Sequence, residues 1–197
     1  MSATITAQQV NDLRNRTGAG LMDCKNALLE SNGDPDAAAE ILRKKGAATR
    51  DKKAGRAASE GIVQAYIHTG GKVGVLVEIN CESDFVAKNE QFQVFAKQLA
   101  MHIAAASPRY VKREEIPAEV VEKEKEIAAA QVTGKPPAAV EKIVQGKLEK
   151  FYSEVCLLDQ PFVMDSNKKI NDLITESITR TGENIVINRF TRYQIGA

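Results

Sequence analysis

Several residue types that mark enzymes and disulfide-stapled folds are scarce in this chain. Its 197 residues include no tryptophan, two histidines and three cysteines. The cysteines are widely separated and form no Cys-x-x-Cys pair, which is typical of a protein from a reducing cytoplasm. No cluster of Cys and His has zinc-ligand spacing, and the glycine motifs of phosphate-binding loops, dinucleotide sites and serine hydrolases do not occur. The sequence therefore predicts no catalytic machinery, no cofactor and no direct nucleotide binding.

Long apolar runs and an excess of one charge are absent as well. The longest apolar-looking stretch, residues 99–106, contains His102 and is much shorter than the roughly 18 residues that a membrane span requires. The first ten residues have neither the basic start nor the apolar centre of a secretory signal. Lys and Arg total 27 against 26 Asp and Glu, which gives a formal net charge of +1. We therefore expect a cytoplasmic protein with no membrane partner and no general attraction to polyanions.

Residues 1–46 carry the start and stop signals of three short helices. Thr6 and Gln9 have the spacing of a capping box at the first start. Asp34 is followed by a proline, which is a strong start signal for the third helix. Glycines interrupt the apolar stripes, and the last of them is Gly46. We predict a three-helix bundle over residues 1–46, with its third helix ending at Gly46.

A basic stretch follows the predicted bundle. Residues 43–56 contain seven Lys and Arg residues against a single acid, Asp51. Because alanines separate the charges, we predict that residues 47–60 form an exposed, helical linker. The alternative is an RNA-associated or ribosome-associated adaptor whose linker touches phosphate groups or an acidic partner, since such contacts need only local cations and weaken with salt.

The hydrophobic period changes from helix to strand after the linker. Apolar residues dominate 61–68 and alternate without a break over 73–81, and the turn between them predicts a β-hairpin. A further β run, residues 185–195, comes more than a hundred residues later. We predict an α+β core over 61–197, in which helices pack on a small three-stranded antiparallel sheet. Apolar residues occupy both phases of the last strand, so part of its cover could come from a second copy of the protein.

Helical periodicity fills the segment between the predicted strands. The pattern indicates a well-packed helix over 89–106 and a charged, weakly packed helix over 117–132. A turn at 133–136 leads into another helix, so the charged region near 117–153 reads as a helical protrusion. The last helix ends at Gly182.

One polar segment does not look like ordinary packing. Phe85 stands beside Asp84 in the turn between the second strand and the next helix. A loop phenylalanine often fills its own core, whereas an exposed one on a rigid loop is a good interface anchor. Cys81 nearby would suggest a nucleophile, but neighbouring carboxylates raise the pKa of a thiol. Core packing is the better interpretation of Cys81.

This segment also carries a family resemblance. The residues Asn80-Cys81-Glu82-Ser83-Asp84-Phe85-Val86-Ala87-Lys88-Asn89 resemble a signature of bacterial and organellar translation elongation factor Ts. Residues 17–25, 101–104 and 160–163 are similar to further motifs of that family, in the expected order. Two departures keep the chemical type, because Ser83 replaces a usual Thr and Leu21 a frequent Met. The resemblance covers essentially the whole chain.

The resemblance implies a guanine-nucleotide exchange factor for elongation factor Tu, the GTPase that delivers aminoacyl-tRNA. It implies that Ser83, Asp84, Phe85 and Val86 displace the Mg²⁺ ion that holds GDP on the partner. By position, Asp84 and Phe85 form the intruding pair. Such a factor acts by differential binding to its partner and is not itself an enzyme.

The resemblance also implies contacts from other parts of the chain. The three-helix segment is expected to be a ubiquitin-associated-like domain that docks on the GTPase domain through Arg14, Leu21 and Met22. His102 is expected to contact the partner from the core helix, although a lone histidine on an apolar helix is more often a satisfied internal residue. Longer family members carry two copies of the core module and this chain has room for one. This short form implies a homodimer, and we expect it in the bacterial cytoplasm.

Overall fold

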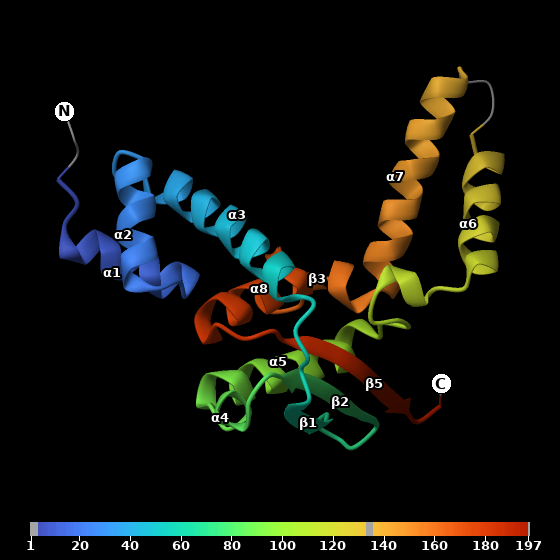
Figure 1. The fold of residues 1–197 in the computed structure, drawn as a ribbon. Helices are drawn as coiled ribbons and strands as arrows, with labels where there is room; N and C mark the ends of the chain where they lie inside the picture. The colour runs from blue at the N-terminus through green and yellow to red at the C-terminus, as the bar shows by residue number, and fades with distance from the viewer. Residues whose placement is uncertain (1–3, 133–135, 197) are drawn as a thin grey trace. The chain divides into compact units, whose positions relative to one another are not determined.

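The structure of the chain is a computed structural model that describes residues 4–132 and 136–196 (Figure 1). These residues form two compact units. The first contains the N-terminal residues up to Ile62, together with Ile79–Phe95 and Asp172–Val186. The second contains Val63–Glu78, Ala96–Asn171 and the residues from Ile187 onward.

The N-terminal helices form a bundle with its own core. The capping box at the first helix is present, because the Thr6 hydroxyl accepts a hydrogen bond from the Gln9 N–H while the Gln9 side chain accepts one from the Thr6 N–H. The Asp34 side chain caps the third helix. The helices are α1 (Ala7–Thr17), α2 (Leu21–Glu30) and α3 (Pro35–Lys53). The buried core of the bundle comprises Val10, Leu13, Ala19, Cys24, Ala27, Leu28, Ala38 and Leu42.

Helix α3 does not end where the sequence predicts. It continues through the buried Gly46 to Lys53, so that half of the predicted linker is part of the same helix. A Cβ atom at position 46 would lie 3.1 Å from side-chain atoms of both Thr175 and Thr179. Gly46 therefore permits close packing of two helices and does not stop one. The division into a bundle at 1–46 and a linker at 47–60 stays a prediction.

The sheet contains the three strands that the sequence pattern predicts. Within the described residues it is three-stranded and antiparallel, in the order β1-β2-β5, so the hairpin strand β2 is central. The bounds are β1 (Glu60–Ile67), β2 (Val73–Cys81) and β5 (Val186–Gln194). On the inner face of β2, the buried side chains are Val75, Val77, Ile79 and Cys81. The α+β class is confirmed.

The helices after the hairpin also follow the predicted order. The bounds are α5 (Glu90–Ala106), α6 (Ala118–Ala130), α7 (Pro137–Val155) and α8 (Ile170–Thr181), with single 3₁₀ turns at Arg113–Glu115 and Leu157–Asp159. Helices α6 and α7 lie side by side as a hairpin (Figure 1). The predicted turn at 133–136 falls largely outside the described residues. Arg113 fixes the base of α7, because its guanidinium pairs with both Glu149 and Asp159.

A small second hairpin was not predicted. From the sequence alone, residues 155–164 have the pattern of an apolar connection that contains Pro161. Instead, β3 (Pro161–Phe162) pairs antiparallel with β4 (Asp165–Lys169). Two residues are too few for a periodic signal, so local pattern could not reveal this strand.

Among the described residues, no helix combines the length and the apolar character needed to cross a membrane.

Candidate functional site

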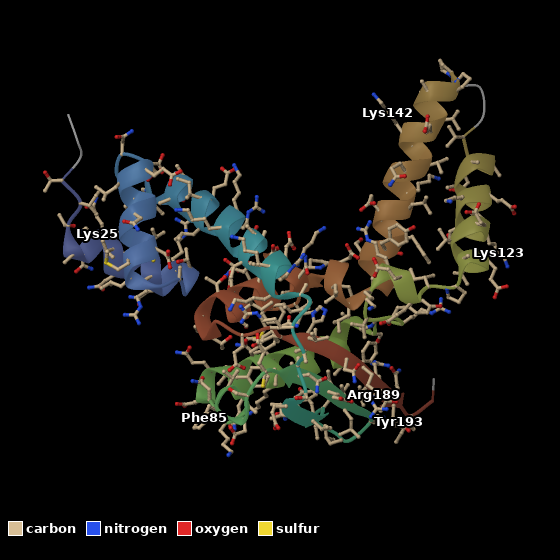
Figure 2. All side chains as sticks on the ribbon, in the orientation of Figure 1. Lys25, Phe85, Lys123, Lys142, Arg189 and Tyr193 are labelled. Carbon is tan, nitrogen blue, oxygen red and sulfur yellow. The ribbon has the colours of Figure 1, made fainter. Side chains whose placement is uncertain are left out.

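A short loop after β2 carries the residues that the sequence singles out. Ser83 caps the one-turn helix α4 (Asp84–Ala87), because its hydroxyl accepts a hydrogen bond from the Val86 N–H at 3.4 Å. Phe85 is the second residue of α4 (labelled in Figure 2) and is 82% exposed. The loop thus presents a bulky aromatic group to solvent, and Phe85 does not fill a core of its own.

Glu183 holds the base of this loop from the turn between α8 and β5. Its Oε2 accepts hydrogen bonds from the backbone N–H groups of Glu82 and Ser83, each at 3.0 Å. Its Oε1 accepts a hydrogen bond from the Ser83 hydroxyl at 2.5 Å. We call these three hydrogen bonds the Glu183 clamp. Because the acceptor is ionised, such bonds are about twice as strong as neutral ones, and they fix the backbone just before Phe85.

Asn184 ties the same loop to the end of the basic stretch. Its backbone N–H donates to Glu82 Oε1 at 2.6 Å, and its buried side-chain amide donates to the Arg56 carbonyl at 2.8 Å. The Arg56 guanidinium lies 3.5 Å from Glu82 Oε2. The hydrogen bond from Asn184 is the main reason that the pKa of the Glu82 carboxyl is lowered, and the Arg56 charge adds to it. Glu82 is therefore an ionised link between Arg56 and the loop.

Asp84 forms an ion pair along the loop itself. Its Oδ2 accepts a hydrogen bond from Lys88 Nζ at 2.6 Å. This hydrogen bond lowers the pKa of the Asp84 carboxyl and raises the pKa of Lys88. Both groups are in contact with solvent, where such pairs contribute little to stability. Asp84 can therefore exchange Lys88 for another polar group at low cost.

Cys81 is a core residue under the loop. Its thiol donates to the Ser83 carbonyl at 3.1 Å. Burial raises the pKa of the thiol, and the negative charge of Glu183 raises it further. A protonated, buried thiol is a poor nucleophile. This environment agrees with the packing role that its strand phase predicts.

The N-terminal bundle exposes an apolar face on α2. Leu21, Met22 and Leu29 are large hydrophobic side chains in contact with solvent, and Lys25 lies on the same helix (Figure 2). At 3.6 residues per turn these side chains span an arc of about 100°. Arg14 on α1 is exposed as well. Leu29 is not among the contacts expected from the sequence, although its i+7 spacing from Met22 places it on the same helix face.

His102 occupies a different environment from the other expected contact residues. Its side chain is fully buried in α5. His102 Nε2 is 2.9 Å from Gln160 Oε1, and Nδ1 accepts a hydrogen bond from the Val163 N–H at 3.3 Å. Burial lowers the pKa of the imidazole. Both ring nitrogens of His102 thus have hydrogen-bond partners inside the chain. A direct contact with a partner protein would require the residues that bury His102 to move.

Most cations of the basic stretch at 43–56 have partners within the chain. The ion pairs are Lys44–Glu40, Lys45–Glu30, Arg50–Asp51 and Arg56–Glu82. Lys53 donates to the Gly182 carbonyl. These pairs lie mostly at the surface, where ion pairs contribute little to stability, so the RNA-adaptor alternative stays a prediction.

A second surface lies on the outer face of the sheet. Its exposed apolar side chains are Val63, Ile67, Leu76, Tyr193 and Ile195, and we call it the outer sheet face. A groove of about 510 Å³ runs along it. At its margin Arg189, labelled with Tyr193 in Figure 2, donates to Glu78 at 2.8 Å. The face is therefore apolar with an ion pair at its edge.

The structure brings Ser83, Asp84, Phe85 and Val86 together in one loop, while the other expected contacts lie elsewhere. Sequence reasoning missed Glu183 and Asn184, which follow the predicted helix stop at Gly182. Their position before a strand expected to pair with the hairpin was the only available signal. Across the described residues, no group of three or more His, Cys, Asp or Glu side chains could hold a metal ion.

Comparison with known proteins gives matches along nearly the whole chain. The sequence model of the family described as Elongation factor TS matches residues 47–197. Elongation factor Ts of Geobacter sulfurreducens is 59% identical over 195 residues, which cover 98% of this chain and 90% of that protein. Elongation factor Ts of Thermodesulfovibrio yellowstonii is 58% identical over 193 residues, covering 98% and 96%. The protein of that name from Thermotoga neapolitana is 56% identical over 192 residues, covering 98% of each chain.

Proposed function

The chain belongs to the elongation factor Ts family, and we propose that it promotes release of GDP from elongation factor Tu during the elongation phase of protein synthesis. The observation that carries the proposal is Phe85, an aromatic side chain that is 82% exposed on a short, hydrogen-bonded loop. An exposed aromatic group on a rigid support suits insertion between elements of a partner.

Exchange of this kind needs no reacting group in the factor. A protein that binds the nucleotide-free GTPase more tightly than the nucleotide-bound form must, by linkage, weaken nucleotide binding by the same factor. GDP on a GTPase is held by phosphate contacts with backbone amides, a lysine and Mg²⁺. Loss of Mg²⁺ leaves phosphate charge uncompensated. Displacing Mg²⁺ is therefore an effective way to weaken the binding of GDP.

Asp84 and Phe85 have different roles in displacing Mg²⁺. Phe85 separates partner elements next to the metal, while Asp84, which is ionised at neutral pH, competes for the groups that organise the metal shell. The lowered pKa of Asp84 supports this role, since a protonated carboxyl would compete poorly. Ser83 and Val86 set the ends of the turn on which both side chains stand.

The exposed face of α2 supports a second contact with the GTPase. Leu21 and Met22 supply apolar area, and Arg14 supplies a charge at the neighbouring helix. This contact anchors the complex while the loop acts on the metal site. The buried His102 is given no direct contact in this proposal.

We further propose that two copies of the chain pair through the outer sheet face. A contiguous apolar face rimmed by polar groups is typical of interaction surfaces. The ion pair between Glu78 and Arg189 leaves no unpaired charge between those two residues to oppose a like surface. One self-complementary patch is sufficient for a two-fold symmetric dimer.

The test of the main proposal is release of a fluorescent GDP analogue from elongation factor Tu. We expect Phe85→Ala to raise the barrier to release by about 2 kcal/mol, the loss typical of an interface anchor, which slows release about 30-fold. Ile127→Ala, which also shortens an exposed apolar side chain, is the matched control and should release GDP at the wild-type rate. Wild-type release by a folded Phe85→Ala variant would refute the proposal.

A further inference from the structure

We infer that Glu183 is a positioning residue for nucleotide exchange, because the Glu183 clamp holds the loop that carries Phe85 in its binding orientation. This inference rests on the proposed function and adds a residue that no motif in the sequence marks. In this proposal, Glu183 does not contact elongation factor Tu. It acts through the backbone of residues 82 and 83.

The geometry is that of a single carboxylate shared by three donors. Both backbone N–H groups lie 3.0 Å from Oε2, and the Ser83 hydroxyl lies 2.5 Å from Oε1. Glu183 is itself held, since its N–H donates to the Thr181 hydroxyl at 3.3 Å. The next residue, Asn184, binds Glu82 and the Arg56 carbonyl. Two consecutive residues therefore fix one end of the loop.

A carboxylate is well suited to this arrangement. Both of its oxygens accept hydrogen bonds, so it serves the two N–H groups and the hydroxyl together, whereas an amide has one accepting oxygen. The same Ser83 hydroxyl also accepts the hydrogen bond from the Val86 N–H that caps α4. The clamp therefore orients the cap of α4 as well as the strand end.

Phe85 depends on this support because it has little packing of its own. Because Phe85 is 82% exposed, the backbone of the loop, and not packing against neighbouring side chains, sets the direction of its Cα–Cβ bond. A loop that is ordered before binding avoids the entropy loss of becoming ordered in the complex. Without the clamp, the binding-competent loop is only a fraction of the population, and the apparent affinity falls by that fraction.

This reasoning predicts which kinetic quantity changes. For Glu183→Ala, the concentration of factor that gives half-maximal GDP release should rise about tenfold, as for loss of a hydrogen bond to a charged group. The release rate at saturating factor should stay close to that of the wild type, because Phe85 is intact once the loop has bound. Phe85→Ala should instead lower the rate at saturation.

The experiment uses the full chain and elongation factor Tu loaded with a fluorescent GDP analogue. Amide hydrogen exchange at Glu82 and Ser83 reports the clamp directly, and both amides should lose protection in Glu183→Ala. Glu183→Gln keeps one acceptor for the two N–H groups, so its half-maximal concentration should lie between wild type and Glu183→Ala. Glu119→Ala, which removes an exposed acid on α6, should leave both readouts unchanged.

The possible results separate this inference from the function on which it depends. If Phe85→Ala slows release but Glu183→Ala and Glu183→Gln keep the wild-type half-maximal concentration, the positioning role is wrong and the proposed function survives. Wild-type release by Phe85→Ala overturns both. A uniform loss of protection throughout Glu183→Ala, with Glu183→Gln behaving as wild type, would reduce Glu183 to a general stability residue and also overturn the inference.

Discussion

His102 shows how one buried side chain can couple stability to pH. Its two ring nitrogens bind Gln160 and the Val163 N–H, an arrangement that suits the neutral imidazole. Burial lowers its pKa below the ordinary value of 6.5. Protonation would place a charge in a position without a counter-charge among its hydrogen-bond partners. The folded state therefore favours the neutral form of the imidazole.

We predict that this histidine makes the chain less stable in mildly acidic solution. As the pH falls below about 6.5, the unfolded state binds a proton that the folded state resists, so the free energy of unfolding decreases by up to about 1.4 kcal/mol per pH unit. Urea unfolding of wild type and His102→Gln at pH 7.5, 6.5 and 5.5 measures the effect. The variant should show a smaller decline, and parallel declines would contradict the prediction.

The acidic groups of the loop act in a different pH range. The pKa values of Glu82 and Asp84 are lowered from 4.5 and 3.8 by their hydrogen bonds. Their stabilising contribution is present above those values and is lost as the pH falls through the folded-state pKa. The histidine effect between pH 5.5 and 6.5 is therefore separable from that of these carboxylates.

At the scale of elements, the close approach of β1 to the end of β2 requires a glycine at position 61. Gly61 has φ 144°, and a Cβ atom there would overlap the Ile79 carbonyl oxygen and lie 2.7 Å from Asn80 Cα. Any side chain would thus force the two backbones apart. The end of β2 that leads into the Phe85 loop is fixed by this close approach.

We expect Gly61→Ala to destabilise the chain by about 2 kcal/mol or more, because it combines backbone strain with a steric overlap. Gly146 in α7 is the matched control, since a Cβ there meets nothing within 4 Å. Gly146→Ala should stabilise by up to about 1 kcal/mol through helix propensity. Thermal and urea unfolding of both variants measure the difference. Equal effects at the two positions would show that the close approach is unimportant.

The elements also show what the sequence can and cannot predict. Alternation over 73–81 and the caps at Thr6 and Asp34 are local signals, and the structure contains the strand and the helix starts that they predict. The helix end predicted at Gly46 is wrong, because the need for a glycine there comes from another helix, whose Thr175 and Thr179 pack against it. A glycine that permits close packing looks the same in a sequence as one that stops a helix.

The candidate site also contains residues that local sequence signals predict and residues that only contacts between distant segments reveal. The motif at 80–89 was readable because its residues are contiguous, and the exposure of Phe85 agrees with the anchor interpretation. Glu183 was missed because it comes from a position 100 residues away from Ser83. His102 was expected to contact a partner, since sequence alone does not show that Gln160 and the Val163 N–H enclose it. Contacts between distant segments were the information that was lacking.

At the scale of the whole molecule, the outer sheet face predicts self-association. Tyr193 is 72% exposed on this face, so burial against a second copy would remove a large aromatic surface from water. We expect Tyr193→Lys to weaken dimerisation by at least about tenfold, as for an interface hot spot. Ile127→Lys, which places the same charge on α6, should dimerise as wild type. Sedimentation equilibrium over a range of concentrations measures both variants, and a wild type that stays monomeric would exclude the dimer.

The long separation between Ser83 and Glu183 also bears on when the protein becomes competent during its own synthesis. Ser83 is added to the growing chain 100 residues before Glu183, whose carboxylate holds the loop of Phe85. Contacts this distant in sequence are also slow to form, because the entropy of closing the long loop opposes them. A nascent chain that already contains Asp84 and Phe85 but not Glu183 lacks the three hydrogen bonds of the Glu183 clamp. On the proposed role of the Glu183 clamp, we expect competence only after Glu183 has emerged and β5 has paired with β2.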